Sequence, residues 1–433
     1  MRTAVLDETF RAAGGRIRAA LAARYRDLDL AEEAFAESCL KAVKVWGEEG
    51  HDLPRDPAAW LYRVAERAAL DILRRRRTRA DNRPDEPDPE PTVEDRLTSD
   101  DAVIPDERLK LIFVCCHPAV AADSRAALTL KMVCGLSTEE VARAFLVSDA
   151  TLAQRLVRAK RKIAEAGVSF EVPGPEHWAE RLAAVLSTLE VAYAKAHEDA
   201  AGSSRHAGFA SEMLEVTALL AEMLPDEAEV LALAATIRFA EARRPARMGA
   251  EGLMVPLAEQ DPTLWSKPLI EEARRYCGRA LGISGPGPRI LQMMIHALWC
   301  GRKSLADPPP WKAVLAAYDI LVELRDDAII RINRAVALAE VKDAEEALAE
   351  LDGLDADALS EFLPFHAARA DLLGRQGRVA EALQAYDRAL VLSPGEAERR
   401  FLQRRREISA ASSVSRVNPL VASSLSAKRG QCE

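Results

Sequence analysis

Residues 136–167 read LSTEEVARAFLVSDATLAQRLVRAKRKIAEAG, a pattern that predicts two short helices joined by a tight turn. Ser137 and Glu140 have the spacing of a capping box, in which each side chain bonds the backbone amide of the other residue. Ser148 and Asp149 then interrupt the first helix, because serine and aspartate favour the start of a new one. We therefore predict a helix-turn-helix, a unit that many DNA-binding proteins use.

The second predicted helix separates apolar from basic side chains. Its apolar positions recur at intervals of four, three and four and form one buried stripe: Leu152, Leu156, Ala159 and Ile163. Its other side carries groups that can bond base edges or phosphates, namely Thr151, Gln154, Arg155 and Arg158, with Lys160, Arg161 and Lys162 following. The plainer alternative is an amphipathic hairpin with a solvated basic face. The cap, the short turn and the excess of basic groups favour DNA binding over that alternative.

Length, charge and cysteine content limit the kinds of protein that this chain can be. A chain of 433 residues is long for one helical core, so we expect two to four domains. The net charge of -9 is unevenly spread, because residues 80–107 hold 11 acidic and 2 basic groups whereas residues 108–168 hold 10 basic and 5 acidic ones. No signal-peptide core and no apolar run of membrane-spanning length is visible, so we expect a cytoplasmic protein without a membrane partner. The seven cysteines form no CxxC pair, and we expect reduced thiols and no metal site.

Residues 1–79 are predicted to form a first helical module. After a loop at 47–57 comes AAWLYRVAERAALDILRRRRTR, with Asp56 as a plausible cap and Pro57 in the first turn. The helix closes on five arginines: Arg74, Arg75, Arg76, Arg77 and Arg79. The helix dipole alone favours cations at the C-terminus of a helix, but five arginines are more than this effect explains. We expect them to contact phosphate.

Four further segments follow. Residues 80–107 are rich in proline and acid and predict a flexible linker, and residues 108–172 hold the helix-turn-helix. Residues 176–285 predict a helical middle domain of unknown role. Within it, charged residues around 243–265 could form a polar site, although surface ion pairs are the commoner outcome. Residues 409–433, rich in serine, predict a disordered tail.

Residues 286–408 repeat themselves. The small, turn and large positions of a helix-turn-helix repeat of roughly 34 residues are occupied by Ala370, Gly377, Ala382, Tyr386, Ala389 and Pro394. A shift of 35 residues places Ala370 on Ala335 and Ala382 on Ala347. Stacked repeats build a concave surface that suits protein partners. A plain helical bundle is the alternative.

The whole arrangement resembles a bacterial sigma factor of the extracytoplasmic-function (ECF) type within the sigma-70 family. The resemblance rests on the arginine-tailed first module, the acidic linker and RLKLIFVCCHPAVAADSRAALTLKMVCGLSTEEVARAFLVSDATLAQRLVRAKRKI. The segment ADLLGRQGRVAEALQAYDRAL narrows it to the subgroup with a C-terminal tetratricopeptide (TPR) extension. It implies an all-α fold with sigma region 2 at 1–79, region 4 at 108–172 and TPR-like repeats at 286–408.

The resemblance also implies roles for single residues. The −35 promoter element would be read by Ser148, Asp149, Thr151, Gln154, Arg155, Arg158, Lys160, Arg161 and Lys162. The −10 element would be held by His51, Trp60, Arg63, Arg67, Arg74, Arg75, Arg76 and Arg77. Core RNA polymerase would be bound by Glu33, Glu37 and Lys41.

The implied function is promoter-specific transcription initiation with core RNA polymerase and promoter DNA as partners. A regulatory protein would bind the repeats, and the chain would carry no catalytic residue and no cofactor. Two alternatives stay open. One is a helix-turn-helix regulator that binds duplex DNA alone, with the repeats as its partner-binding domain. The other is a repeat scaffold whose basic faces are incidental.

Overall fold

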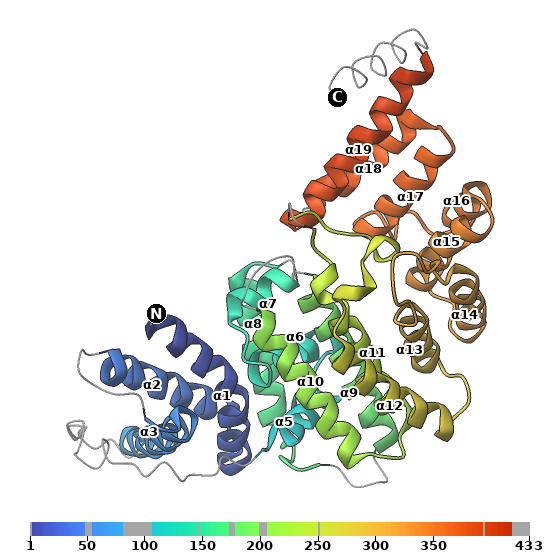
Figure 1. Cartoon of the computed structure of the whole chain (residues 1–433). Helices are drawn as coiled ribbons and strands as arrows, with labels where there is room; N and C mark the ends of the chain where they lie inside the picture. The colour runs from blue at the N-terminus through green and yellow to red at the C-terminus, as the bar shows by residue number, and fades with distance from the viewer. Residues whose placement is uncertain are drawn as a thin grey trace. The chain divides into compact units, whose positions relative to one another are not determined.

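The structure is a computed structural model that describes residues 2–47, 54–80, 106–145, 147–172, 178–198, 206–249, 252–392 and 395–417. These residues form helices joined by short connections, with one isolated β-bridge between Met248 and Met254 and no sheet (Figure 1). The all-α fold is thereby confirmed. The chain divides into two compact units, Met1–Met223 and Leu224–Glu433. No helix among the described residues is long and apolar enough to cross a membrane.

Three long helices open the first unit: α1 (Arg2–Tyr25), α2 (Leu28–Gly47) and α3 (Pro57–Ala80). They pack against one another around buried apolar side chains that include Leu21 and Leu61. Asp56 caps α3 as predicted, because its Oδ1 accepts a hydrogen bond of 2.9 Å from the amide of Ala59. Asp27 caps α2 in the same way through the amide of Leu30.

The predicted helix-turn-helix is present. It follows α5 (Arg108–Cys115) and α6 (Ala122–Met132) and consists of α7 (Thr138–Ala144) and α8 (Asp149–Glu165). Both bonds of the capping box form, from the amide of Ser137 to Glu140 at 2.7 Å and from the amide of Glu140 to Ser137 at 3.1 Å. The predicted stripe of α8 is buried throughout: Leu152, Leu156, Ala159 and Ile163.

Two more helices complete the first unit, α9 (Trp178–Glu198) and α10 (His206–Met223). Figure 1 shows them in green beside α5 and α6, and both have contacts with α5. Their buried side chains include Leu186, Leu189 and Leu220. The division between the units therefore falls inside the range 176–285, which the sequence predicts as one middle domain.

The second unit begins with α11 (Ala228–Ala242), α12 (Lys267–Ile283) and α13 (Pro288–Trp299). Helical pairs follow: α14 (Trp311–Leu324), α15 (Ala328–Val341), α16 (Ala344–Asp352), α17 (Leu363–Arg375), α18 (Val379–Val391) and α19 (Glu396–Val417). The repeat positions Ala370, Ala382 and Ala389 are fully buried, as are Ala335 and Ala347 one repeat earlier. Small residues at these positions let the paired helices approach closely.

The predicted linker and the predicted C-terminal tail lie partly outside the described residues. Residues 81–105 of the linker lie outside the described residues. In the predicted disordered tail, residues 409–417 are instead helical, because α19 continues to Val417. No proline interrupts the helix between Gly395 and this point, and serine and alanine are compatible with a helical backbone. Residues 418–433 lie outside the described residues.

Candidate nucleic-acid interface

One side of α8 gathers the polar residues that the sequence singles out. Ser148 is the N-cap of α8 and accepts a hydrogen bond of 3.2 Å from the amide of Thr151. Gln154 and Arg158 are exposed, and the Nε of Arg158 donates to the backbone oxygen of Gln154 at 3.3 Å. Asp149 is also exposed, and Arg155 is half-buried on the same side. The start of α8 thus offers donors and acceptors to a groove-sized ligand.

The three basic residues that follow have different partners: Lys160 contacts α2, whereas Arg161 and Lys162 contact Glu165 of α8. Lys160 lies two positions after Arg158, which turns its side chain by about 200° around the helix axis. Its Nζ contacts Asp29 at 2.5 Å and Glu32 at 2.8 Å on α2. Arg161 pairs with Glu165 at 2.6 Å on the exposed side of α8. Of the predicted −35 residues, Lys160 is therefore the one that the structure places apart from the others.

Trp60 is a core residue in this structure. Its side chain is 5% exposed, and its ring centroid lies 4.8 Å from that of Trp46. Phe10 also stacks on Trp46, with ring centroids 6.4 Å apart. A base could stack on Trp60 only if this aromatic cluster opened, so the structure does not offer Trp60 to a −10 base. Apolar rings at helical spacing fill a core for the same physical reason that they bind bases, and the sequence does not separate the two roles.

Other predicted −10 residues lie along α3. Arg67 and Arg77 are exposed and Arg63 is half-buried, whereas His51 lies outside the described residues. Arg74 pairs with Asp71 at 3.2 Å on its own helix. This row of arginines gives α3 a cationic exposed side.

Two arginines of the α3 tail pair with the predicted polymerase-binding residues of α2. Arg76 contacts Glu33 at 3.0 Å and also Asp27 at 3.0 Å, and Arg75 contacts Glu37 at 3.6 Å. All these side chains are between about a third and a half exposed, so each pair contributes little to stability. Lys41 is half-buried on the same helix. The arginine tail is thus partly neutralised by α2 rather than wholly available to phosphate.

A buried ion cluster surrounds Arg108 in the first unit. Arg108, 4% exposed, donates to Asp106, to Glu212 at 2.8 Å and to Glu215 at 2.9 Å. Burial opposes its charge, but the three carboxylates raise its pKa above the usual value. For Glu212 the balance is reversed: burial raises its pKa although Arg108 acts in the opposite direction. Nothing in the sequence around residue 108 signals a partner about a hundred positions away.

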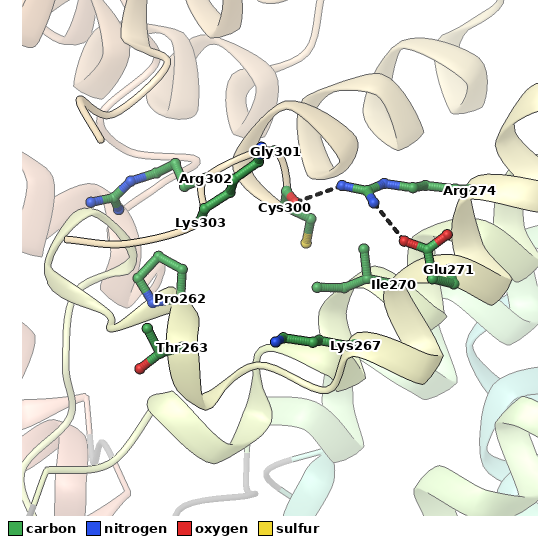
Figure 2. Close-up of a pocket in the computed structure, with 10 residues that line it drawn as sticks. All are labelled: Pro262, Thr263, Lys267, Ile270, Glu271, Arg274, Cys300, Gly301, Arg302 and Lys303. Atoms are coloured by element: carbon green, nitrogen blue, oxygen red, sulfur yellow. Dashed lines mark hydrogen bonds and ion pairs between the residues drawn. The ribbon is translucent and has the colours of Figure 1, made fainter. Parts of the chain in front are cut away.

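The second unit contains a pocket of about 350 Å³, whose 10 lining residues are drawn in Figure 2. Arg274 on its wall bonds Glu271 at 2.7 Å and the backbone oxygen of Cys300 at 3.4 Å, as the dashed lines in Figure 2 show. Nearby, Arg244 pairs with Glu241 at 2.6 Å, and Arg243 bonds His296 at 2.9 Å. Arg243 and Arg244 therefore hold neighbouring helices of the fold. Within the described ranges, no three His, Cys, Asp or Glu side chains gather as metal ligands would.

These features are typical of a DNA-binding protein, with a helix-turn-helix module and a second helical module that has a cationic side. Residues 9–79 match the family described as Sigma-70 region 2, and residues 110–163 match Sigma-70, region 4. The chain belongs to the sigma-70 family of sigma factors. Members of this family are transcription factors rather than enzymes, and their domains bind core RNA polymerase and promoter DNA.

Two further similarities concern the rest of the chain. Residues 181–281, from α9 to α12, match a family of unknown function (DUF6596). An uncharacterized protein of Rhizobium meliloti (strain 1021) is 37% identical over 390 residues, which cover 89% of this chain and 91% of that protein. The similarity therefore extends through both units. The similarity to the Rhizobium meliloti protein therefore covers the sigma regions and the C-terminal helices together.

Proposed function

We propose that the chain is an alternative sigma factor of the ECF type whose α8 reads the −35 element in the major groove. The observation that carries this proposal is the exposed polar side of α8, directly after its N-cap. A groove-reading helix presents its N-terminal residues to base edges. Gln154 and Arg158 are exposed there, and their side chains are among those that form paired hydrogen bonds with adenine and guanine.

For region 2, we propose that Arg63, Arg67 and Arg77 hold the non-template strand near the −10 element. Cationic side chains on one helix suit a single strand, because they follow its phosphates without reading a groove. Trp60 is left out of this proposal because it fills the core. Glu33, Glu37 and Lys41 on α2 would contact core polymerase, with Arg75 and Arg76 holding the two glutamates in place.

The direct test is transcription by purified full-length protein with core polymerase on fragments of the host genome. Promoter-specific transcripts are expected. Arg158→Ala should reduce them roughly 5- to 150-fold, since a paired base contact is worth about 1–3 kcal/mol. Arg325→Ala is the matched control, because Arg325 is 60% exposed and lies in the second unit. No responding promoter, or equal losses in both variants, would refute the proposal.

A different experiment tests the alternative of a stand-alone helix-turn-helix regulator. That alternative requires tight binding of a palindromic duplex by the protein without polymerase. Gel-shift assays with and without core polymerase separate the two functions. Specific binding that polymerase does not strengthen would favour the regulator.

We further propose that the helices after α13 form TPR-like repeats that bind a regulatory protein. Support comes from the buried small residues of α15 to α18, such as Ala347 and Ala382, which recur after 35 positions. The informative truncation ends at Met223, because α9 and α10 belong to the first unit. A chain of residues 1–223 should differ from the full chain in transcription or in polymerase affinity. Identical behaviour of the two chains would rule out a regulatory role.

A further inference from the structure

The pocket of the second unit lies along the first two turns of α12 (Figure 2), and we call it the α12 pocket. Residues on one side of this helix line it: Lys267, Ile270, Glu271 and Arg274. Residues 300–303, which follow α13, and the 3-10 turn η4 (Pro262–Leu264) complete the lining. Its volume of about 350 Å³ falls in the lower part of the range for small-molecule sites, about 300–1,000 Å³.

Hydrogen bonds hold both loops that form the α12 pocket. The guanidinium of Arg302, a residue that is 7% exposed, donates to two backbone oxygens at 3.0 and 3.1 Å. The carboxylate of Asp307 accepts a hydrogen bond of 2.6 Å from the amide of Lys303. On the other loop, Asp261 caps η4, because its Oδ1 accepts from the amide of Thr263 at 2.9 Å. The pocket is therefore formed without a ligand, as small-molecule sites usually are.

The interior of the α12 pocket is apolar. Figure 2 shows the sulfur of Cys300 directed into the space between Pro262 and Ile270. Burial raises the pKa of the Cys300 thiol above its usual value, although Arg243 acts in the opposite direction. The thiol is therefore protonated and uncharged at neutral pH. It contributes to the interior as a small apolar group and does not repel an anion.

Basic side chains outnumber acidic ones in the lining of the α12 pocket. Lys267, Arg274, Arg302 and Lys303 are basic, whereas Glu271 is acidic. Glu271 is paired with Arg274 at 2.7 Å, and the guanidinium of Arg302 bonds uncharged carbonyl oxygens. Within the described ranges neither Lys267 nor Lys303 forms a salt bridge, and both are exposed. Figure 2 shows the amine of Lys267 directed into the pocket, so its charge is available to an anion there.

We propose that the α12 pocket binds a small organic carboxylate, with its charged group at Lys267 and Lys303 and its apolar body against Ile270 and Cys300. An uncharged molecule would leave the two ammonium groups without a partner, and an inorganic anion would leave the apolar interior to water. Small-molecule sites commonly combine an apolar interior with a few polar groups that fix the orientation of the ligand. The inference goes beyond the proposed function and does not depend on it, because the second unit binds the carboxylate without polymerase or DNA.

The first test measures which chemical features the α12 pocket recognises. Hexanoate is titrated into the full-length protein and followed by saturation-transfer NMR, with an expected dissociation constant on the order of 1 mM for so small a ligand. Three other probes are compared with it: 1-hexanol has the same body without the charge, acetate has the charge with almost no body, and inorganic phosphate has charge alone. Each should bind roughly fivefold more weakly or worse. No binding of hexanoate up to about 20 mM, or a smaller difference for any of the three, overturns the proposal.

The second test reverses one charge at the pocket. Lys267→Glu should weaken hexanoate binding roughly fivefold or more, because a repulsion replaces an attraction. Lys267 is the first residue of α12, where the helix dipole favours an acidic side chain, so we expect the variant to fold. The control is Lys312→Glu, which makes the same change at an exposed lysine in the first turn of α14, away from the pocket. A smaller loss for Lys267→Glu, or an equal loss in the control, overturns the proposal.

Hydrogen exchange of the full-length protein locates the bound probe. At a hexanoate concentration about ten times its dissociation constant, peptides that cover residues 262–274 and 300–307 should exchange roughly tenfold more slowly. Exchange that is not slowed in these peptides overturns the assignment to the α12 pocket. The transcription assay is a separate measurement, so the proposed function and the carboxylate site can fail independently of each other.

Discussion

The buried guanidinium of Arg108 pairs with the carboxylates of Asp106, Glu212 and Glu215. Arg108→Leu would leave the carboxylate of Glu212, only 8% exposed, without its 2.8 Å partner. Removal of one partner of a buried pair typically costs 3–5 kcal/mol. We expect about 3 kcal/mol, the lower end, because Glu212 can take up a proton. The lost contact with Glu215 adds little to the cost of this substitution, since the side chain of Glu215 is 54% exposed and can be hydrated.

The pH dependence follows from the direction of the pKa shift. Burial already raises the pKa of Glu212, and the loss of Arg108 removes the main group that opposes this rise. A carboxyl whose pKa is higher in the folded state binds more protons there than in the unfolded state. The carboxyl of Glu212 therefore contributes most to the stability of the folded state below its unfolded pKa. This contribution is lost as the pH rises through the folded pKa. The variant should be weakened more at pH 8 than at pH 5.

Hydrogen exchange followed by mass spectrometry is the suitable assay, because peptides from α5 and α10 report on this site alone. At pH 8 the protection of α5 should fall by roughly 10²-fold, the equivalent of about 3 kcal/mol. A second change, Glu212→Leu, should restore most of it, whereas Glu215→Leu in the same background should not. Protection within threefold of the parent protein, or equal rescue by both second changes, would refute the reasoning.

Three other substitutions test the packing. Gly278→Ala should stabilise the second unit by about 0.5–1 kcal/mol in thermal unfolding, because the added Cβ would meet nothing within 4 Å on α12; a lower melting temperature would contradict this. Trp60→Ala should cost about 3–5 kcal/mol in urea unfolding by emptying the ring cluster with Trp46, and a loss below 1 kcal/mol would mean that Trp60 is not a core residue. Asp343→Ala should cost about 1 kcal/mol, since its side chain accepts bonds of 2.9 Å from two backbone amides of α16; hydrogen exchange of α16 that does not change would count against the cap.

The local elements of the first unit could be predicted because their causes lie within a few residues. The capping box of Ser137 and Glu140 depends on a spacing of three, and the stripe of α8 depends on a helical period of 3.6 residues. The cap of α3 by Asp56 is equally local. The buried repeat positions Ala370 and Ala382 follow from the same kind of periodicity.

Whether a polar or aromatic side chain is available to a ligand depends on residues far along the chain. Trp60 is covered by Trp46 and is part of the core, although its position in the sequence suits a base-stacking role. Arg108 finds Glu212 after 104 positions. These pairings follow from how whole helices dock, and helix docking depends on the sum of many apolar contacts.

The sequence by itself determined the helices, their caps and the basic character of the DNA-reading module, since periodicity and charge are properties of neighbouring residues. Only the tertiary structure decided where that charge goes. Lys160 belongs to the same basic run as Arg158, yet it meets Asp29 and Glu32 of a helix about 130 positions earlier. The physical reason is that a helix turns about 100° per residue, so neighbouring cations face different surroundings, and the surroundings are set by distant parts of the fold.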